Sequence, residues 1–222
     1  MLRRAIHQSL KYILWHWLME CSAHRGIVLR FWEQDKLWIS KVHDAIDLIE
    51  RLDPRTFRLM RRLLEGGIAV DLPQTRSLGW YDDDRKACGL ARDYVPKAPV
   101  EDIALTIVHE TCHARLMHCG IGYTEAERYR VEQVCRRREI AFARLLAKDT
   151  ADAETLVQDA LDRLERMSPE DHTDAAWANR RWRDQLMRLR HQNEMGGPKC
   201  LRRLVVRRAR NQRSAHRWRE PD

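Results

Sequence analysis

Five consecutive residues, His109-Glu110-Thr111-Cys112-His113, form the pattern in this chain that most directly implies chemistry. In an α-helix, residues four positions apart lie one turn apart on the same face, so both imidazoles can reach one metal ion. Glu110 lies a further third of a turn around the helix, where a carboxylate can contact a zinc-bound water without binding the zinc. Zinc lowers the pKa of that water toward neutrality, and the glutamate removes its proton as it attacks a carbonyl. The motif predicts one Zn²⁺ per chain, with His109 and His113 as ligands and Glu110 as general base.

The residues around this motif predict that it lies on a buried helix over about residues 99–119. Pro99 stands where a first helical residue is expected, and Glu101 places negative charge in the first turn. A largely apolar stretch, Ile103–Val108, precedes the histidines, and Gly120 stands where a helix-ending glycine is expected. Two histidines and a glutamate on a buried helix need partners, and a zinc ion supplies them.

A second helix, predicted from about Thr124 to Ala147, carries glutamates that are candidates for a third ligand. Glu132, Cys135, Glu139 and Phe142 share one stripe of this helix, because they are spaced by three, four and three residues. Apolar residues border the stripe, so the two glutamates lie at the margin of the apolar face. A glutamate in that position is expected to have a partner.

An HExxH motif followed about twenty residues later by a glutamate on a helix resembles the gluzincin, or thermolysin-like, group of zinc metallopeptidases. The resemblance covers about residues 85–147. It implies three zinc ligands, His109, His113 and Glu132, the last of which lies nineteen residues after His113. It also implies that Glu110 is the general base and that the substrate is a protein or a peptide.

The third ligand has alternatives. Glu139 competes with Glu132, because its spacing and the Glu-x-x-Phe-Ala run that it begins are similar to short HExxH proteins related to bacterial stress regulators. Cys119, Cys135 and a histidine further along the chain are other candidates. The chain departs from the thermolysin-like pattern at Arg136, where that group carries an acidic residue that orients a zinc-bound histidine. Either another carboxylate takes this role or the role is missing.

The predicted fold is α+β, mainly helical, with a small antiparallel sheet directly before the HExxH helix. Short strands are expected at Gly66–Leu72, Trp80–Tyr81 and Cys88–Val95, with a turn at Asp82–Asp84. This order is similar to that of zincins, in which an edge strand lies over the cleft. An extended peptide can pair with such a strand.

The chain is predicted to contain one domain, residues 1–197, followed by a basic extension, residues 198–222. Within the domain we expect N-terminal helices at 1–65, the sheet and the active-site helices at 66–147, and further helices at 148–197.

Three residues near the motif are candidates for stabilising an oxyanion: Tyr123, Arg128 and Tyr129.

Composition favours a cytoplasmic protein without a membrane span. The 222 residues are 44% hydrophobic with a mean hydropathy of −0.63, enough for one core. The most apolar run, residues 12–19, is too short to cross a bilayer, and we expect it to be a buried amphipathic helix. Six cysteines without CxxC pairs favour reduced thiols over a disulfide framework.

Positive charge is concentrated at the C-terminal end. Residues 199–222 contain nine Lys or Arg and two acidic residues, which gives +7 of the chain's formal charge of +8. The segment 199–219 is a candidate contact for nucleic acid or an acidic partner.

The HExxH motif and its surroundings predict a zinc-dependent metallopeptidase. The alternatives are a regulatory HExxH protein with one specific partner or a nucleic-acid-associated role, and a structural zinc protein without turnover.

Overall fold

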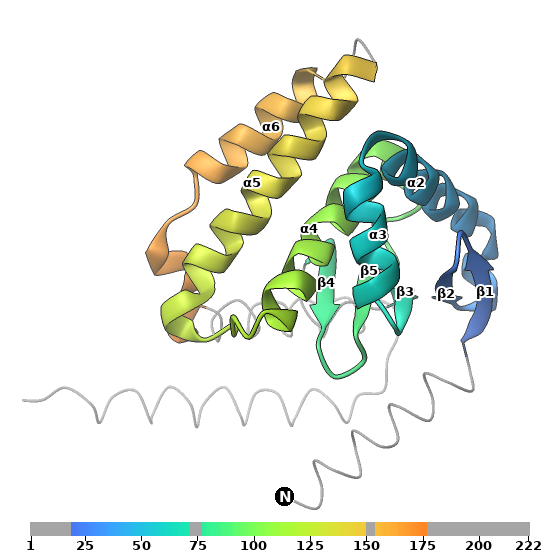
Figure 1. Ribbon diagram of the computed structural model, residues 1–222, viewed down its shortest axis with the longest axis horizontal. Coiled ribbons are helices and arrows are strands. Elements are labelled where there is room, and N and C mark those ends of the chain that lie inside the picture. The colour runs from blue at the N-terminus through green and yellow to red at the C-terminus, as the bar shows by residue number, and fades with distance from the viewer. Residues whose placement is uncertain (1–18, 72–76, 150–153, 177–222) are drawn as a thin grey trace, which may run out of the picture. The chain divides into compact units, whose positions relative to one another are not determined.

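The computed structural model describes residues 19–71, 77–149 and 154–176, which form both helices and strands. The strands are β1 (Glu20–His24), β2 (Ile27–Phe31), β3 (Gly67–Asp71), β4 (Gly79–Asp82) and β5 (Ala87–Ala91). The α-helices are α2 (Ile39–Leu52), α3 (Pro54–Leu63), α4 (Val100–His118), α5 (Glu125–Asp149) and α6 (Glu154–Glu165), and short 3₁₀ helices lie at η1 (Glu33–Trp38) and η3 (Pro169–His172) (Figure 1). The mainly helical α+β fold that the sequence predicts is confirmed.

The first described element is a β-hairpin, which lies within the range 1–65 where helices are predicted. β1 pairs antiparallel with β2 through a two-residue turn. Arg25 and Gly26 in this turn have φ values of 52° and 79°, and such left-handed conformations are those that tight hairpin turns require. In β2, Ile27, Leu29 and Phe31 are buried and alternate with less buried residues. That period of two is typical of a strand, so the prediction of helices throughout residues 1–65 is wrong here.

The sheet is mixed, in the order β1-β2-β3-β5-β4. The two outer pairings are antiparallel, whereas β2 with β3 and β3 with β5 are parallel. The prediction of an antiparallel sheet is therefore wrong for its centre. The reason is the connection: α2 and α3 lie between β2 and β3 in the chain, and such a crossover joins parallel strands.

Two helices follow the hairpin, within the range where N-terminal helices are predicted. The first spans Ile39–Leu52. The second begins where Asp53 caps it, because the Asp53 carboxylate accepts a hydrogen bond from the backbone N–H of Thr56. Both helices contribute buried apolar residues to a core shared with the sheet and α4.

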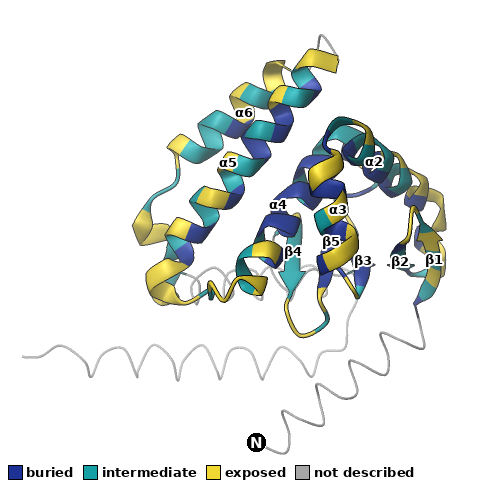
Figure 2. Cartoon of the chain, in the orientation of Figure 1, coloured by how far each residue is buried: buried dark blue, intermediate teal, exposed yellow. Residues whose placement is uncertain are grey.

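α4 is the central helix of this core and carries the HExxH motif. Its bounds are within one residue of those predicted at each end. Ten of its residues, from Ile103 to Ala114, are buried, and Figure 2 shows the burial along its length. α4 packs against α2, α3 and α5, and α5 packs against α6 (Figure 1). The prediction of a buried motif helix is confirmed.

Several predicted segments lie outside the described residues. They include residues 12–18 of the apolar run and the whole basic extension. In the range 148–197, where further helices are predicted, residues 150–153 and 177–197 are also not described. Among the described residues, no helix combines the length and the apolar composition that crossing a bilayer requires.

Candidate metal centre

The two histidines of the motif point their ring nitrogens at one another. His109 and His113 lie one turn apart on α4, with ring centroids 5.0 Å apart and ring planes tilted by 59°. Their Nε2 atoms are 3.2 Å apart. Two imidazole nitrogens at this distance either share a hydrogen bond or hold a common ion.

Glu132 on α5 reaches both of these nitrogens. Its Oε2 lies 3.3 Å from Nε2 of His109, and its Oε1 lies 3.4 Å from Nε2 of His113. Zinc–ligand bonds of about 2.0–2.1 Å in tetrahedral geometry separate neighbouring donor atoms by about 3.3 Å. The three side chains come from two packed helices and have the donor types and separations that fit one zinc ion.

Glu139 lies on the opposite side of His109 from Glu132. Its Oε2 is 3.1 Å from Nδ1 of His109 and accepts a 2.6 Å bond from the Arg136 guanidinium. Arg163 of α6 is 3.6 Å from the other carboxylate oxygen. A carboxylate bonded to the far ring nitrogen fixes the orientation and tautomer of a metal-binding histidine. Glu139 therefore lies where such an orienting carboxylate is needed, one turn beyond the Arg136 position at which the thermolysin-like pattern has one.

Tyr123 holds Glu132 from the turn before α5. Its hydroxyl donates a hydrogen bond to Oε1 of Glu132, and its ring meets the edge of the His113 ring at a centroid distance of 5.4 Å. The guanidinium of Arg128 lies over the Tyr123 ring and donates to the carbonyl of His172. Tyr129 contacts the ring of His172. Of the three candidate oxyanion donors, Tyr123 contacts the residues of the centre, through Glu132 and His113.

Glu110 is buried on α4 and faces β4. A Cβ atom added to Gly79, the first residue of β4, would lie 3.2 Å from Cγ of Glu110 and 2.5 Å from Cγ2 of Thr106. Only glycine allows the strand to approach the helix so closely. Burial raises the pKa of Glu110, while the charges of His113 and His109 oppose the rise. Glu110 is thus a buried carboxylate on α4, the helix that carries both histidines, and its side chain lies against the strand β4.

The charges of the cluster compensate one another. Burial disfavours protonation of His109, but hydrogen bonds to Glu132 and Glu139 outweigh it and raise the pKa of His109 to about 10. Burial disfavours ionisation of Glu132, but hydrogen bonds from the two histidines outweigh it and hold the pKa of Glu132 far below its ordinary value. A positive charge between these groups is therefore favourable.

Cys135 is a further possible donor. Its sulfur and one nitrogen each of His109 and His113 lie within 4.8 Å of one another. The carboxylate oxygens of Glu132 lie 3.3 and 3.4 Å from the Nε2 atoms of His109 and His113, so Glu132 and Cys135 are both candidates for a further ligand. Cys119, another predicted alternative, is exposed at the C-terminal end of α4.

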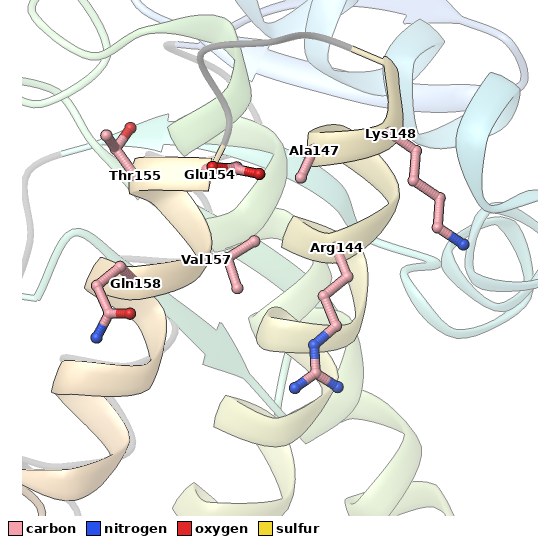
Figure 3. A pocket seen from close by; sticks show the side chains of 7 residues that line it. All are labelled: Arg144, Ala147, Lys148, Glu154, Thr155, Val157 and Gln158. Carbon is pink, nitrogen blue, oxygen red and sulfur yellow. The ribbon is translucent and has the colours of Figure 1, made fainter.

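A hollow of about 720 Å³ lies apart from this centre, between the C-terminal end of α5 and the start of α6 (Figure 3). Arg144 and Lys148 of α5 and Val157 and Gln158 of α6 are among the residues that line it. None of its lining residues belongs to the histidine and carboxylate cluster. The hollow is therefore no part of the candidate metal centre.

No protein-family model, curated protein or solved structure matches the chain.

Proposed function

We propose that the chain is a zinc-dependent metallopeptidase that hydrolyses peptide bonds in proteins or peptides. One observation carries the proposal: two imidazole nitrogens and a carboxylate meet at separations of 3.2–3.4 Å. Three protein ligands with a fourth position for water are typical of a catalytic zinc site. Glu110, buried beside these ligands, is the carboxylate available for proton transfer.

Each residue has a separate task in this reaction. His109, His113 and Glu132 would hold the zinc, which when bound acts as a Lewis acid toward one water molecule. Glu110 accepts a proton from the attacking water and returns it to the leaving amine. Burial raises the pKa of Glu110, which brings it closer to neutral pH, where a group that both accepts and donates a proton is most effective.

The edge strand β4 supports a peptide as the substrate. The backbone N–H of Ala91 donates to the carbonyl of Leu78 at 2.8 Å, and the two strands then pair Trp80 with Gly89. Because hydrogen-bonded pairs alternate in an antiparallel ladder, the backbone groups of Gly79 and Tyr81 face away from β5. β4 is the last strand of the sheet, so these groups line an edge to which an extended peptide can add next to Glu110.

The substitution Glu110→Gln tests the proposal, because an amide has nearly the shape of a carboxylate but does not accept the proton. Zinc content, thermal unfolding and cleavage of casein and a peptide panel are measured on the same preparations of both proteins. The variant should keep its zinc and its fold while cleavage falls by about 10²–10⁴-fold or more. Loss of zinc would instead identify Glu110 as a ligand, and unchanged cleavage would move the activity to another site.

Cys135 favours a second candidate function, a structural zinc site without turnover. Its thiol is within 4.8 Å of the histidine donors and would complete a closed site of four protein ligands. Cobalt substitution separates the two candidates, since a thiolate ligand adds an intense charge-transfer absorption in the near ultraviolet. We expect cobalt-loaded protein to lack this band, and Cys135→Ser to keep its zinc. The band, together with zinc loss in Cys135→Ser, would favour the structural site.

A further inference from the structure

Two thiols meet between the two helices that carry the candidate ligands. Cys112 directly precedes His113 on α4, and Cys135 lies three residues after Glu132 on α5. Their side chains lie together in one small buried cluster, near enough for the two thiols to interact. The metallopeptidase reaction proposed above gives neither thiol a task.

The surroundings of the pair are apolar. Cys112 and Cys135 form a small buried cluster with Val131, against which Leu116 and Tyr123 pack. Cys112 is 9% exposed, whereas Cys135 is completely buried. A small oxidant arriving from solvent therefore meets the sulfur of Cys112 first. A disulfide in these surroundings leaves no strong hydrogen-bonding group without a partner, because a thiol is a weak donor and a weak acceptor.

We propose that Cys112 and Cys135 are a redox couple whose oxidised form is a disulfide joining α4 to α5 beside the metal centre. The oxidant is hydrogen peroxide. Cys112 sulfur attacks one peroxide oxygen, the O–O bond breaks, and a sulfenic acid and one water form. Cys135 sulfur then displaces the hydroxyl group as a second water, and the S–S bond forms. Two thiols lose two protons and two electrons, and hydrogen peroxide takes up both to form two waters.

The couple controls the number of donors at the centre, and this part of the inference rests on the proposed zinc function. Cys135 is the thiol near the histidine donors, and in a disulfide its sulfur cannot bind a metal as a thiolate. The oxidised protein therefore has only His109, His113 and Glu132 as donors. In the reduced protein the Cys135 thiol remains available beside the fourth position, which water occupies in the metallopeptidase proposed above.

Tryptic peptides report the disulfide directly, because each of the two cysteines lies alone in its own peptide. Cleavage after Lys97 and Arg115 releases residues 98–115 with Cys112, and cleavage after Arg130 and Arg136 releases residues 131–136 with Cys135. Reduced full-length protein, with and without zinc, is treated with hydrogen peroxide, quenched with N-ethylmaleimide and digested without reduction. We expect a linked pair of these peptides, two hydrogens lighter than their sum, that a phosphine reductant separates again.

Serine variants of three cysteines test whether the disulfide joins Cys112 to Cys135. Cys112→Ser and Cys135→Ser should each abolish the linked peptide, whereas Cys119→Ser on the exposed end of α4 should leave its yield unchanged. Peroxide should also raise the unfolding midpoint of the wild type and of Cys119→Ser, but not of the other two variants, since the disulfide closes a loop. Oxidation of Cys112 to sulfinic acid without a link, or a link from either cysteine to Cys119 instead, would overturn the couple. A linked peptide accompanied by loss of zinc would uphold the couple and overturn the proposed ligand set.

Discussion

Two clusters of paired histidines with carboxylates lie among the described residues, and they are arranged differently. In the first, on α4 and α5, His109 and His113 bring their Nε2 atoms to 3.2 Å and both contact Glu132. In the second, between β1 and α2, the rings of His24 and His43 stack face to face at 4.4 Å with an interplanar angle of 10°.

Stacked rings direct their nitrogens along parallel planes, so the donors of the second cluster do not converge. Asp47 there lies 2.8 Å from Nε2 of His24 and also accepts a 2.9 Å bond from Arg25, which already neutralises its charge. In the cluster on α4 and α5, the guanidinium groups of Arg136 and Arg163 contact Glu139 and not Glu132, whose oxygens face the two histidines. Residue composition therefore does not distinguish a metal site from an ion-pair cluster, whereas convergence of donor atoms does.

Removing one histidine from each cluster tests this comparison, and we expect it to change zinc content more than any other substitution. His109→Ala and His113→Ala should each abolish stoichiometric zinc, because two remaining donors hold the ion far more weakly than three. His24→Ala, the matched control, should retain one zinc per chain. Metal analysis after reconstitution and dialysis measures both. Equal zinc loss in all three variants, or none in any, would show that convergence is not the distinguishing property.

The two glutamates of α5 sharpen the comparison by separating a ligand from an orienting partner. Glu132→Ala should weaken zinc affinity by orders of magnitude, since its oxygens face both Nε2 atoms. Glu139→Ala removes only the bond to Nδ1 of His109, and loss of such a partner typically costs about 10–100-fold in affinity. Competition titrations with a zinc chelator measure both constants. The reverse order would make Glu139 the ligand.

Part of this site was predictable from the sequence. The spacing of His109 and His113 places them on one helix face, and the stripe on the next helix placed both glutamates beside the apolar face. The pairing of Glu132 and Glu139 with particular histidine nitrogens depends on how α5 is rotated about its axis and on the angle at which it crosses α4. The periodicity of a single helix does not encode either quantity. Glu139 and Glu132 are seven residues apart, two turns, which was the available signal that both face one helix. Tyr123 lies in a turn, where no repeating pattern indicates its partner.

Gly79→Ala tests whether the centre on α4 depends on the neighbouring strand. The added Cβ would overlap Cγ2 of Thr106 at 2.5 Å, so β4 or the helix must shift beside Glu110. We expect lower peptidase activity with zinc retained, and a loss of stability of about 1–3 kcal/mol, as is typical of overpacking. Gly122→Ala is the control, because its Cβ would make only a 3.7 Å contact with Thr124. Zinc content, unfolding midpoint and cleavage rate are measured for both. Equal activity in the two variants would separate β4 from the site.

The fold was less predictable where strands pair across long stretches of chain. Helices with strong local signals, such as α4 with its acidic first turn and final glycine, were located to within a residue at each end. The hairpin at Glu20–Phe31 was missed, although Arg25-Gly26 and the alternation in β2 are a local signal for it. The parallel pairing of β3 with β5 has no such local signal, because β4 lies between them in the chain and outside them in the sheet.

The smallest predicted effect is a pH dependence of stability in the cluster between β1 and α2. Burial lowers the pKa of His43, and the charge of His24 lowers it further, while Asp44 and Asp47 oppose both. Nε2 of His43 is buried without a hydrogen-bond partner among the described residues. The unfolded chain therefore binds this proton first as the pH falls, so the contribution of neutral His43 is complete above the ordinary histidine range near 6.5 and is lost below it.

His43→Gln removes this contribution while keeping a neutral polar side chain of similar reach. Thermal unfolding of zinc-loaded wild type and variant is compared from pH 8 to pH 5. The wild type should lose stability relative to the variant as the pH falls through the ordinary histidine range, since only the wild type has a proton to bind on unfolding. Zinc binding by His109 and His113 is common to both proteins and cancels in the difference. Parallel curves would mean that His43 titrates alike in the folded and unfolded chains, and burial of its ring would then carry no electrostatic cost.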